Sequence, residues 1–292
     1  MLRPLAVPFI LLLHMLDAHA EQPQFEDRVG DAYEIRLESA SQTSLNGRSS
    51  GRSSSKQAMV ERVIALHDGG IELEFDLPEQ ASQQDRARTW QLPVRVLKSP
   101  GRPLQLLNRP ELETRVRAWL QTAKIPQSAC GRWIFTWTAV KIECDPNSVL
   151  NTIEPFDLRL GEFGEGTLHN ESGARGPAAL RREAFDSNGA TYAAELEIDP
   201  DVMRRQRAEA DVAVAEMTRK APLTLEAALQ ARQGNRISGT IVTTFEMDSA
   251  GRVTRRRRVT QVEIADQAGS LERETTTETV ERRLVSRHEQ RP

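Results

Sequence analysis

The candidate reactive residues of this 292-residue chain are few and scattered. His67 precedes an Asp-Gly-Gly turn sequence, His169 lies in a glycine-rich stretch, and His288 lies near the C-terminus. The patterns HExxH, CxxC, GxSxG and the P-loop do not occur. His67-Asp68 could form a metal or catalytic pair, but its position predicts a turn. The sequence therefore indicates no catalytic residues, no metal site and no cofactor.

Two further patterns have a chemical and a structural interpretation. Glu72, Glu74 and Asp76 share one face of an alternating stretch, which is typical of a solvated strand face. The glycine-rich run GEFGEG at 161–166 resembles a phosphate loop in composition, but its two glutamates would repel phosphate. Neither pattern predicts a site.

Three tryptophans, Trp119, Trp133 and Trp137, lie close together in the sequence. Tryptophan rings bury large areas, so packing in the core is one interpretation. The alternative is that they form the aromatic wall of a pocket for an apolar ligand. These three residues are the candidate ligand-binding residues of the chain.

The chain contains two cysteines, Cys130 and Cys144. An even number of cysteines in an exported protein favours a disulfide. Fourteen residues in one straight strand or helix would hold the two Cα atoms about 20 Å or more apart, whereas a disulfide needs about 7 Å or less. Either the chain reverses between these cysteines or both thiols are free.

The N-terminus has the features of a signal peptide. Arg3 precedes an apolar run from Leu5 to Met15, and Ala18-His19-Ala20 places small residues before a cleavage site after Ala20. No other apolar run approaches the ~20 residues of a membrane span, so no transmembrane segment is expected. Residues 1–20 are thus a predicted signal peptide, and the predicted location is periplasmic or secreted. The net charge of −3 argues against a nucleic-acid partner.

Alternating apolar residues predict four antiparallel strands near residues 33–37, 59–66, 71–77 and 90–96. Between the first two, residues 39–56 are rich in serine and glycine and have no apolar pattern, so a flexible loop is expected. Residues 287–292 are expected to be a disordered tail, and 21–292 a single domain.

The middle of the chain is predicted to be largely helical. Asn108, with Glu111 in capping-box position, begins one helix, and Asp145-Pro146 begins a short one over 147–153. Residues 132–143 fit a strand or a helix, with a weak preference for strand. Two more helices are expected, at 199–220 and 225–232, followed by a strand-rich C-terminal region.

Residues 236–285 predict three long strands, with turns near Gly251 and Gly269. The face of the first strand that carries Ile241, Phe245 and Met247 is expected to pack on the preceding helices. The arginines at 255–258 could bind an anionic partner, but nearby glutamates favour a solvated, charge-balanced face.

The expected fold class is α+β, with antiparallel β-meanders at both ends packed on a central helical region. This element order, with the turn sequence FEMDSAGRV, resembles the periplasmic lipoprotein-carrier half-barrels. The resemblance implies a curved half-barrel sheet and transfers no site residue. The leading hypothesis is a non-enzymatic envelope protein that binds a lipid or other apolar ligand. The alternatives are an envelope interaction module that uses an open sheet edge, and an enzyme with an unrecognised site.

Overall fold

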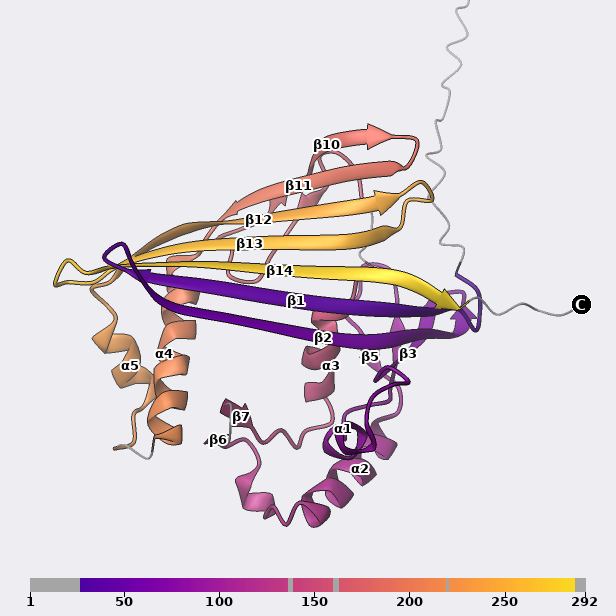
Figure 1. Cartoon of the computed structure of the whole chain (residues 1–292), viewed down its shortest axis with the longest axis horizontal. Helices are drawn as coiled ribbons and strands as arrows, with labels where there is room; N and C mark the ends of the chain where they lie inside the picture. Colours follow the sequence, from indigo (N-terminus) through magenta and orange to yellow (C-terminus); the bar gives the residue numbers. More distant parts are fainter. Residues whose placement is uncertain (1–26, 136–138, 160–162, 219–220, 287–292) are drawn as a thin grey trace, which may run out of the picture.

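A ten-stranded antiparallel sheet dominates the computed structural model, which describes residues 27–135, 139–159, 163–218 and 221–286. The strand order is β10-β11-β12-β13-β14-β1-β2-β3-β4-β5. The labelled helices lie on one side of this sheet (Figure 1). The two end strands, β10 and β5, do not pair with each other, so the sheet is open. The α+β class with a large antiparallel sheet is therefore confirmed.

Both predicted meanders are present, and they join edge to edge. The N-terminal meander consists of β1 (Ala32–Leu45), β2 (Arg48–His67), β3 (Gly70–Asp76), β4 (Val94–Lys98) and β5 (Gln105–Leu106). The predicted C-terminal meander consists of β12 (Arg236–Asp248), β13 (Val253–Ala265) and β14 (Leu271–Ser286), and β10 (Arg181–Asp186) and β11 (Gly189–Glu197) extend the sheet beside β12. β14 pairs with β1 along its whole length, from Ala32 opposite Ser286 to Leu45 opposite Glu272. The first and last described strands of the chain thus meet at the centre of the sheet.

The prediction of a flexible loop at residues 39–56 was wrong. These residues extend β1 and β2, which pair from Ala32 opposite Arg62 to Leu45 opposite Arg48. Asn46 and Gly47 form the two-residue turn, with φ of 51° and 78°. Positive φ at both positions is the geometry that Asn-Gly adopts in tight hairpins. A serine-rich segment forms a strand here because β14 and β2 both pair with β1.

The described helices are α1 (Gln83–Arg88), α2 (Arg109–Thr122), α3 (Ser148–Ile153), α4 (Pro200–Met217) and α5 (Leu225–Ala231), with 3₁₀ turns η1 (Gln127–Ala129) and η2 (Glu154–Phe156). Asp199 and Thr224 cap α4 and α5. Asn108 precedes α2 but makes no capping bond, because its Oδ1 accepts from the Arg95 backbone N at 3.0 Å. Short strands β6 (Trp133–Phe135), β7 (Ala139–Lys141), β8 (Leu168–His169) and β9 (Ala178–Ala179) complete the fold.

The core lies between the helices and the inner face of the sheet, the face that the helices cover. Its largest fully buried side chains include Phe75, Phe156, Phe245, Leu73 and Leu112. Phe245 is buried as expected, but a different segment covers it. Its ring packs edge-on against Phe163 and His169, with ring centres 4.8 and 5.0 Å away. Val214 lies on α4, one of the preceding helices that were expected to cover this face, and is 50% exposed.

The strand register of the C-terminal meander differs from the register that its two turn sequences alone suggest. Met247 lies opposite Val253, with an irregularity next to Glu246. Ala265 lies opposite Leu271, which places Glu263 opposite Arg273. This shift pairs opposite charges where a one-residue slip would oppose two glutamates. The pairing of β13 with both of its neighbours is regular from Val259 to Val262.

Several predictions fall outside the described ranges. They are the signal peptide at 1–20, the tail at 287–292 and the placement of Trp137. The single-domain organisation of 21–292 stays a prediction. Within the described ranges, no helix is long and apolar enough to span a membrane.

Candidate functional site

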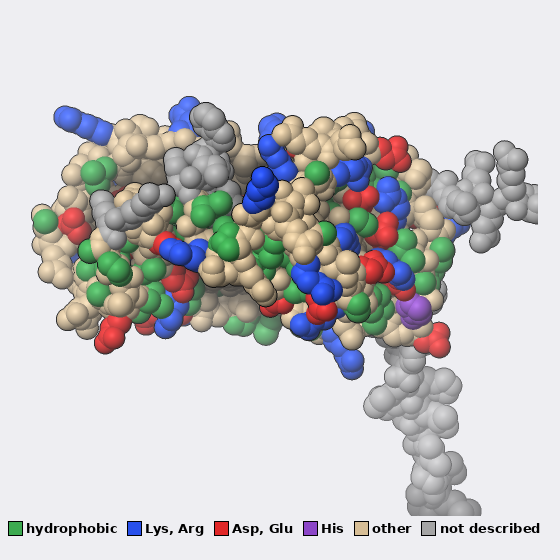
Figure 2. Space-filling view, turned by 90° about the horizontal axis from the view of Figure 1, so that it is seen from below, with side chains coloured by type: hydrophobic (Ala, Val, Ile, Leu, Met, Phe, Trp, Pro, Cys, Tyr) green, Lys and Arg blue, Asp and Glu red, His purple; other side chains and the backbone are tan. Residues whose placement is uncertain are grey.

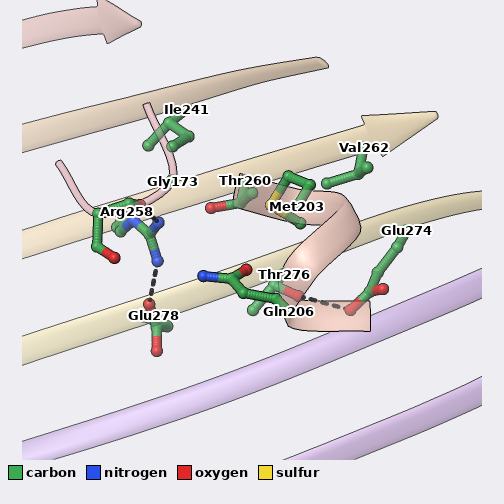
Figure 3. Close-up of a pocket in the computed structure, with 11 residues that line it drawn as sticks. Gly173, Met203, Gln206, Ile241, Arg258, Thr260, Val262, Glu274, Thr276 and Glu278 are labelled. Atoms are coloured by element: carbon green, nitrogen blue, oxygen red, sulfur yellow. Dashed lines mark hydrogen bonds and ion pairs between the residues drawn. The ribbon is translucent and has the colours of Figure 1, made fainter. Parts of the chain in front are cut away.

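A cavity of about 210 Å³ lies between α4 and the inner face of β12, β13 and β14. Figure 3 shows Met203 and Gln206 reaching it from α4, with Gly173 at one end. Its walls combine apolar and polar side chains, namely Ser172, Gly173, Met203, Gln206, Ile241, Arg258, Thr260, Val262, Glu274, Thr276 and Glu278. The volume is below the ~300–1,000 Å³ of drug-sized pockets, so the cavity suits a small molecule or one end of a larger one.

The floor of the cavity follows from strand register. Ile241, Thr260 and Thr276 lie opposite one another on β12, β13 and β14. Because side chains alternate between the faces of a strand, residues two positions away also face inward. The inward residues of β13 are therefore Arg258, Thr260 and Val262, which run from polar to apolar along the floor.

Helix α4 forms the roof of the cavity. Asp199 begins the helix: its Oδ1 accepts hydrogen bonds from the backbone N of Asp201 at 2.8 Å and of Val202 at 3.2 Å. Ala208 and Ala213 are buried. Arg207 on the same helix forms ion pairs with Glu272 and Glu274 of β14. These contacts connect α4 to the sheet beside the cavity.

A network of polar groups lies at the Arg258 end. The Arg258 guanidinium donates to Glu278 Oε2 at 3.0 Å and to the Ser172 carbonyl at 2.9 Å, and its Nε lies 3.5 Å from Glu171 Oε2. Glu171 Oε1 accepts from Thr243 Oγ1 at 2.8 Å and contacts His169 Nε2 at 3.0 Å. The network fixes Arg258 against the loop that contains Ser172.

The charge state of Glu171 follows from its surroundings. Burial alone would raise the pKa of this carboxyl, but hydrogen bonds from His169 and Thr243 and the charge of Arg258 outweigh it, so the pKa is lowered. Glu171 is therefore an anion at neutral pH. It acts as a fixed negative charge behind Arg258.

Two buried polar atoms of the cavity wall, Arg258 Nε and Thr260 Oγ1, form no hydrogen bond within the described chain. Arg258 Nε lies 3.5 Å from a carboxylate oxygen of Glu171, whereas no ion pair compensates the Thr260 hydroxyl. A buried hydroxyl without a partner loses about 1–3 kcal/mol relative to a satisfied one. A ligand with a hydrogen-bonding group could recover this energy, which makes the cavity suited to binding. Groups of three or more potential metal ligands are absent from the described residues.

A second cluster, buried and ionic, lies at the other end of the sheet. Arg159 pairs with Asp27 and with Glu61, whose Oε1 also accepts from Arg282 Nη2 at 2.8 Å. Tyr33 donates to Asp27 Oδ1 at 2.9 Å, and its ring lies under the Arg282 guanidinium. The four charged side chains are at most 6% exposed. The cluster joins the residues before β1, the sheet and the segment after η2.

The pKa shifts of Asp27, Glu61 and Arg159 favour their charged forms, whereas burial raises the pKa of Tyr33 and favours its neutral phenol. Burial opposes ionisation of Asp27 and Glu61, but Arg159 and Arg282 outweigh it and lower the pKa of both carboxyls. Burial also opposes the charge of Arg159, and its two carboxylate partners raise its pKa. A carboxyl held ionised cannot donate a proton at neutral pH, so this arrangement is that of a structural ion cluster.

Neither Trp119 nor Trp133 lines the cavity, and Trp137 lies outside the described residues. Trp119 on α2 is partly buried against the core, and Trp133 in β6 is half-buried. The described aromatic contacts join Phe163 with Tyr192 and Phe245, and His169 with Phe245. An apolar-ligand role for Trp119 and Trp133 stays a prediction.

Cys130 and Cys144 form a disulfide, with Cα atoms 5.6 Å apart. The antiparallel pairing of β6 with β7 provides the chain reversal that this bond requires. The ambiguous stretch 132–143 thus contains two short strands.

The arginines at 255–258 are largely engaged within the protein. Arg255 pairs with Glu246 and Glu281, Arg256 donates to the Pro155 carbonyl at 2.9 Å, and Arg258 belongs to the cavity network. On the helix side, basic and acidic side chains are interspersed (Figure 2). These pairs agree with the charge-balanced interpretation.

Sequence reasoning missed both the cavity and the ionic cluster. For the cavity, the available signal was the inward phase shared by Thr260 and Ile241 in neighbouring strands. Nothing local indicated the ionic cluster, because Arg159 is 98 residues from Glu61 and 132 from Asp27.

Comparison with known proteins does not place the chain in a family. No family model and no curated protein matches it. Among solved structures, one of lipovitellin, concerning lipid–protein interactions, has a TM-score of 0.41 at 11% identity; the match covers 90% of this chain and 26% of that one. An outer membrane channel from Pseudomonas putida F1 has a TM-score of 0.17 at 8% identity, with 87% and 96% of the two chains covered. A hot dog fold protein of unknown function from Alicyclobacillus acidocaldarius has a TM-score of 0.12 at 11% identity, with 91% and 83% covered. Similarity at this level supports no assignment of function.

Proposed function

We propose that this protein is an exported, non-enzymatic envelope protein that binds a small ligand with an apolar part in the cavity beneath α4. The observation that carries the proposal is the cavity itself, where Met203, Ile241 and Val262 lie beside the unpartnered hydroxyl of Thr260. An apolar segment would pack against the first three residues, and a polar end would hydrogen-bond at the fourth. The sheet acts in this proposal as a half-barrel wrapped over helices, supported by the helices lying on one side (Figure 1).

Two features support export. The sequence of residues 1–20 has the charge, apolar run and cleavage residues of a signal peptide. The Cys130–Cys144 disulfide is of a kind that persists in oxidising compartments. N-terminal sequencing of protein recovered outside the cytoplasm tests this directly: Glu21 is the expected first residue, and Met1 would contradict it.

Ligand binding can be tested with 1-alkanols from butanol to octanol, followed by NMR titration. Each buried methylene should tighten binding about fourfold until the cavity is full. Thr276→Tyr, on the cavity side of β14, should weaken binding at least tenfold, by the loss of one or two buried methylenes and of the polar site. Native mass spectrometry of protein from its own host would identify a retained ligand.

The matched control is Thr275→Tyr, the same change on the opposite face of β14, where the residue is exposed. Its affinity for alkanols should equal that of the wild type. Circular dichroism and melting confirm that both variants fold. Equal alkanol affinity in a folded Thr276→Tyr variant would place binding elsewhere, and the absence of any binding would refute the proposal.

An open strand edge favours a second function, that of an interaction module. β3 pairs with β2 only over Val60–His67, so within the described chain residues 48–59 of β2 pair on one side alone. Such edges accept an added strand from a partner. The edge carries Arg48, Arg52 and Lys56, which are typical of edges protected from association.

A photocrosslinking residue at Arg52, in protein expressed in its host, tests this second function. One discrete protein adduct is expected there, and none from the same residue at Arg257 on the outer sheet face. No adduct at Arg52 would count against an edge partner.

A further inference from the structure

Carboxylates outnumber guanidinium groups around the cavity. Four carboxylates, those of Glu171, Glu272, Glu274 and Glu278, pair there with only two guanidinium groups, those of Arg207 and Arg258. Of the neighbouring charges on α4, Arg204 pairs with Asp201 and so adds no net charge. His169 contacts Glu171. Among the residues that line the cavity itself, the carboxylates of Glu274 and Glu278 outnumber the single guanidinium, that of Arg258.

Both arginines are already paired with carboxylates, and Arg258 Nε, which is buried without a hydrogen bond, lies 3.5 Å from Glu171 Oε2. The Arg258 guanidinium is engaged with Glu278, Glu171 and the Ser172 carbonyl. Arg207 is engaged with Glu272 and Glu274. A carboxylate or phosphate entering the cavity would have to displace one of these partners, which leaves a carboxylate without its cation.

The cavity wall offers hydrogen-bond acceptors instead. Glu278 uses Oε2 for Arg258, and its other oxygen makes no hydrogen bond within the described chain. Thr260 contributes its unpartnered Oγ1, and Gln206 reaches toward the strands from α4 (Figure 3). An ammonium group has three donors and no acceptor, so it matches a wall of carboxylate, hydroxyl and amide oxygens.

We propose that the cavity selects a small cationic amphiphile, with a primary ammonium group among Glu278, Thr260 and Gln206 and an aliphatic chain against Met203, Ile241 and Val262. This inference rests on the proposed binding function and specifies its ligand class. A free alkylamine and a lysine-like side chain share this chemistry.

Three six-carbon probes separate head-group charge from apolar binding: hexylammonium, 1-hexanol and hexanoate, whose alkyl chain is one methylene shorter, each titrated by NMR at pH 7. Millimolar affinities are expected for molecules of this size. Hexylammonium should bind with an affinity about tenfold or more above that of hexanol, and hexanoate should bind more weakly than hexanol. Raising the salt concentration should reduce the difference between the two charged probes, because ions screen exposed charge interactions.

Nα-acetyl-lysine amide distinguishes the two sources of the ammonium group. Binding of this probe with an affinity close to that of hexylammonium would indicate a lysine-like side chain. Weaker binding by at least tenfold would indicate a free alkylamine, and either result is compatible with the cationic class.

Glu278→Gln supplies the sharpest variant, because it removes one acceptor charge and one of the two carboxylate partners of Arg258. The ratio of hexylammonium to hexanoate affinity should fall by about tenfold or more. Glu263→Gln is the matched control, since Glu263 also pairs with an arginine across β13 and β14, Arg273, but is exposed. It should leave the ratio within about twofold of the wild type.

The outcomes separate the two proposals. If hexanol binds and hexanoate binds as tightly as hexylammonium, the cationic selectivity is refuted and the apolar binding site stands. If Glu278→Gln and Glu263→Gln change the ratio equally, the selectivity arises from net charge and not from the cavity. If none of the six-carbon probes binds, the binding function itself fails.

Discussion

The two halves of the β1–β2 hairpin differ in composition and in burial, although their backbone pairing is the same. At one end Tyr33, Ile35, Met59 and Glu61 are buried beneath the helices and the segment after η2. At the other end the strands continue through serine and glycine, and Arg48 to Gln57 are exposed. Both halves pair with the same neighbours on the β1 side. Backbone pairing therefore suffices for strand structure, whereas the covering segments decide which half belongs to the core.

The largest expected effect comes from the ionic cluster at the buried end. Arg159→Met should reduce the free energy of unfolding by about 3–5 kcal/mol, because Asp27 and Glu61 stay buried with one cation fewer. Lys56→Met, which removes the exposed partner of Glu38 in the serine-rich half, should change it by at most about 0.5 kcal/mol. Urea denaturation measures both, and equal losses would remove the distinction between the halves.

The same contrast applies across the two faces of the C-terminal meander. Phe245→Ala should cost about 3–5 kcal/mol, since its fully buried ring packs against Phe163 and His169 and would leave a cavity. Arg257→Ala, on an exposed outer position, should stay within about 0.5 kcal/mol. A small effect of Phe245→Ala in the same denaturation experiment would mean that the inner face is not tightly packed.

Low pH should reduce the stability that the ionic cluster contributes at the buried end of the hairpin. Asp27 and Glu61 have folded-state pKa values below those of the unfolded chain, about 3.9 and 4.3 respectively. Their contribution is therefore fully present above the unfolded values and is lost as the pH falls through the folded ones. The urea midpoint of the wild type should decline below about pH 4.

Glu61→Gln should flatten that decline, because one of the two titrating groups is gone. Ser53→Ala, in the exposed half, should retain the wild-type pH profile. Parallel pH profiles for Glu61→Gln and the wild type would show that other carboxyls control acid stability.

Shortening the exposed half of the hairpin should also have only a small effect on stability. Gln42 lies opposite Arg52, so an Asn-Gly turn can replace residues 43–51 without changing the register. The loss should be about 1 kcal/mol or less, because few apolar contacts disappear. A loss comparable to that of Arg159→Met would show that the exposed half contributes to the global fold.

Strand prediction from the sequence worked where burial alternates. β3 and β12 were recognised because one face of each is covered, which selects apolar residues at every second position. The serine-rich half of β1 and β2 has no such alternation of apolar residues, since no described segment covers it. Its composition alone indicated a loop. The Asn46-Gly47 turn was the one local signal of a hairpin there.

The candidate site was less predictable than the fold. The apolar wall could be inferred in part, because Ile241 belonged to the expected buried face of β12. The meeting of Arg258 with Glu278 depends on the register of β13 and β14, and a one-residue slip would pair Arg257 with Glu278 on the outer face instead. The buried pairs of Arg159 depend on contacts across 98 and 132 residues, which no local pattern encodes.

By itself, the sequence determined the α+β class, the two meanders and the main helices, because these follow from local periodicity and capping residues. Chain geometry left Cys130 and Cys144 either joined across a chain reversal or free, and the structure shows the disulfide. Only the tertiary structure decided that β14 pairs with β1, which half of the hairpin is covered, and which charges meet inside. Those features depend on the free energy of contacts between distant segments. Whether a residue is buried depends on which segments cover it. The chemistry of its own side chain determines only the free-energy cost of that burial.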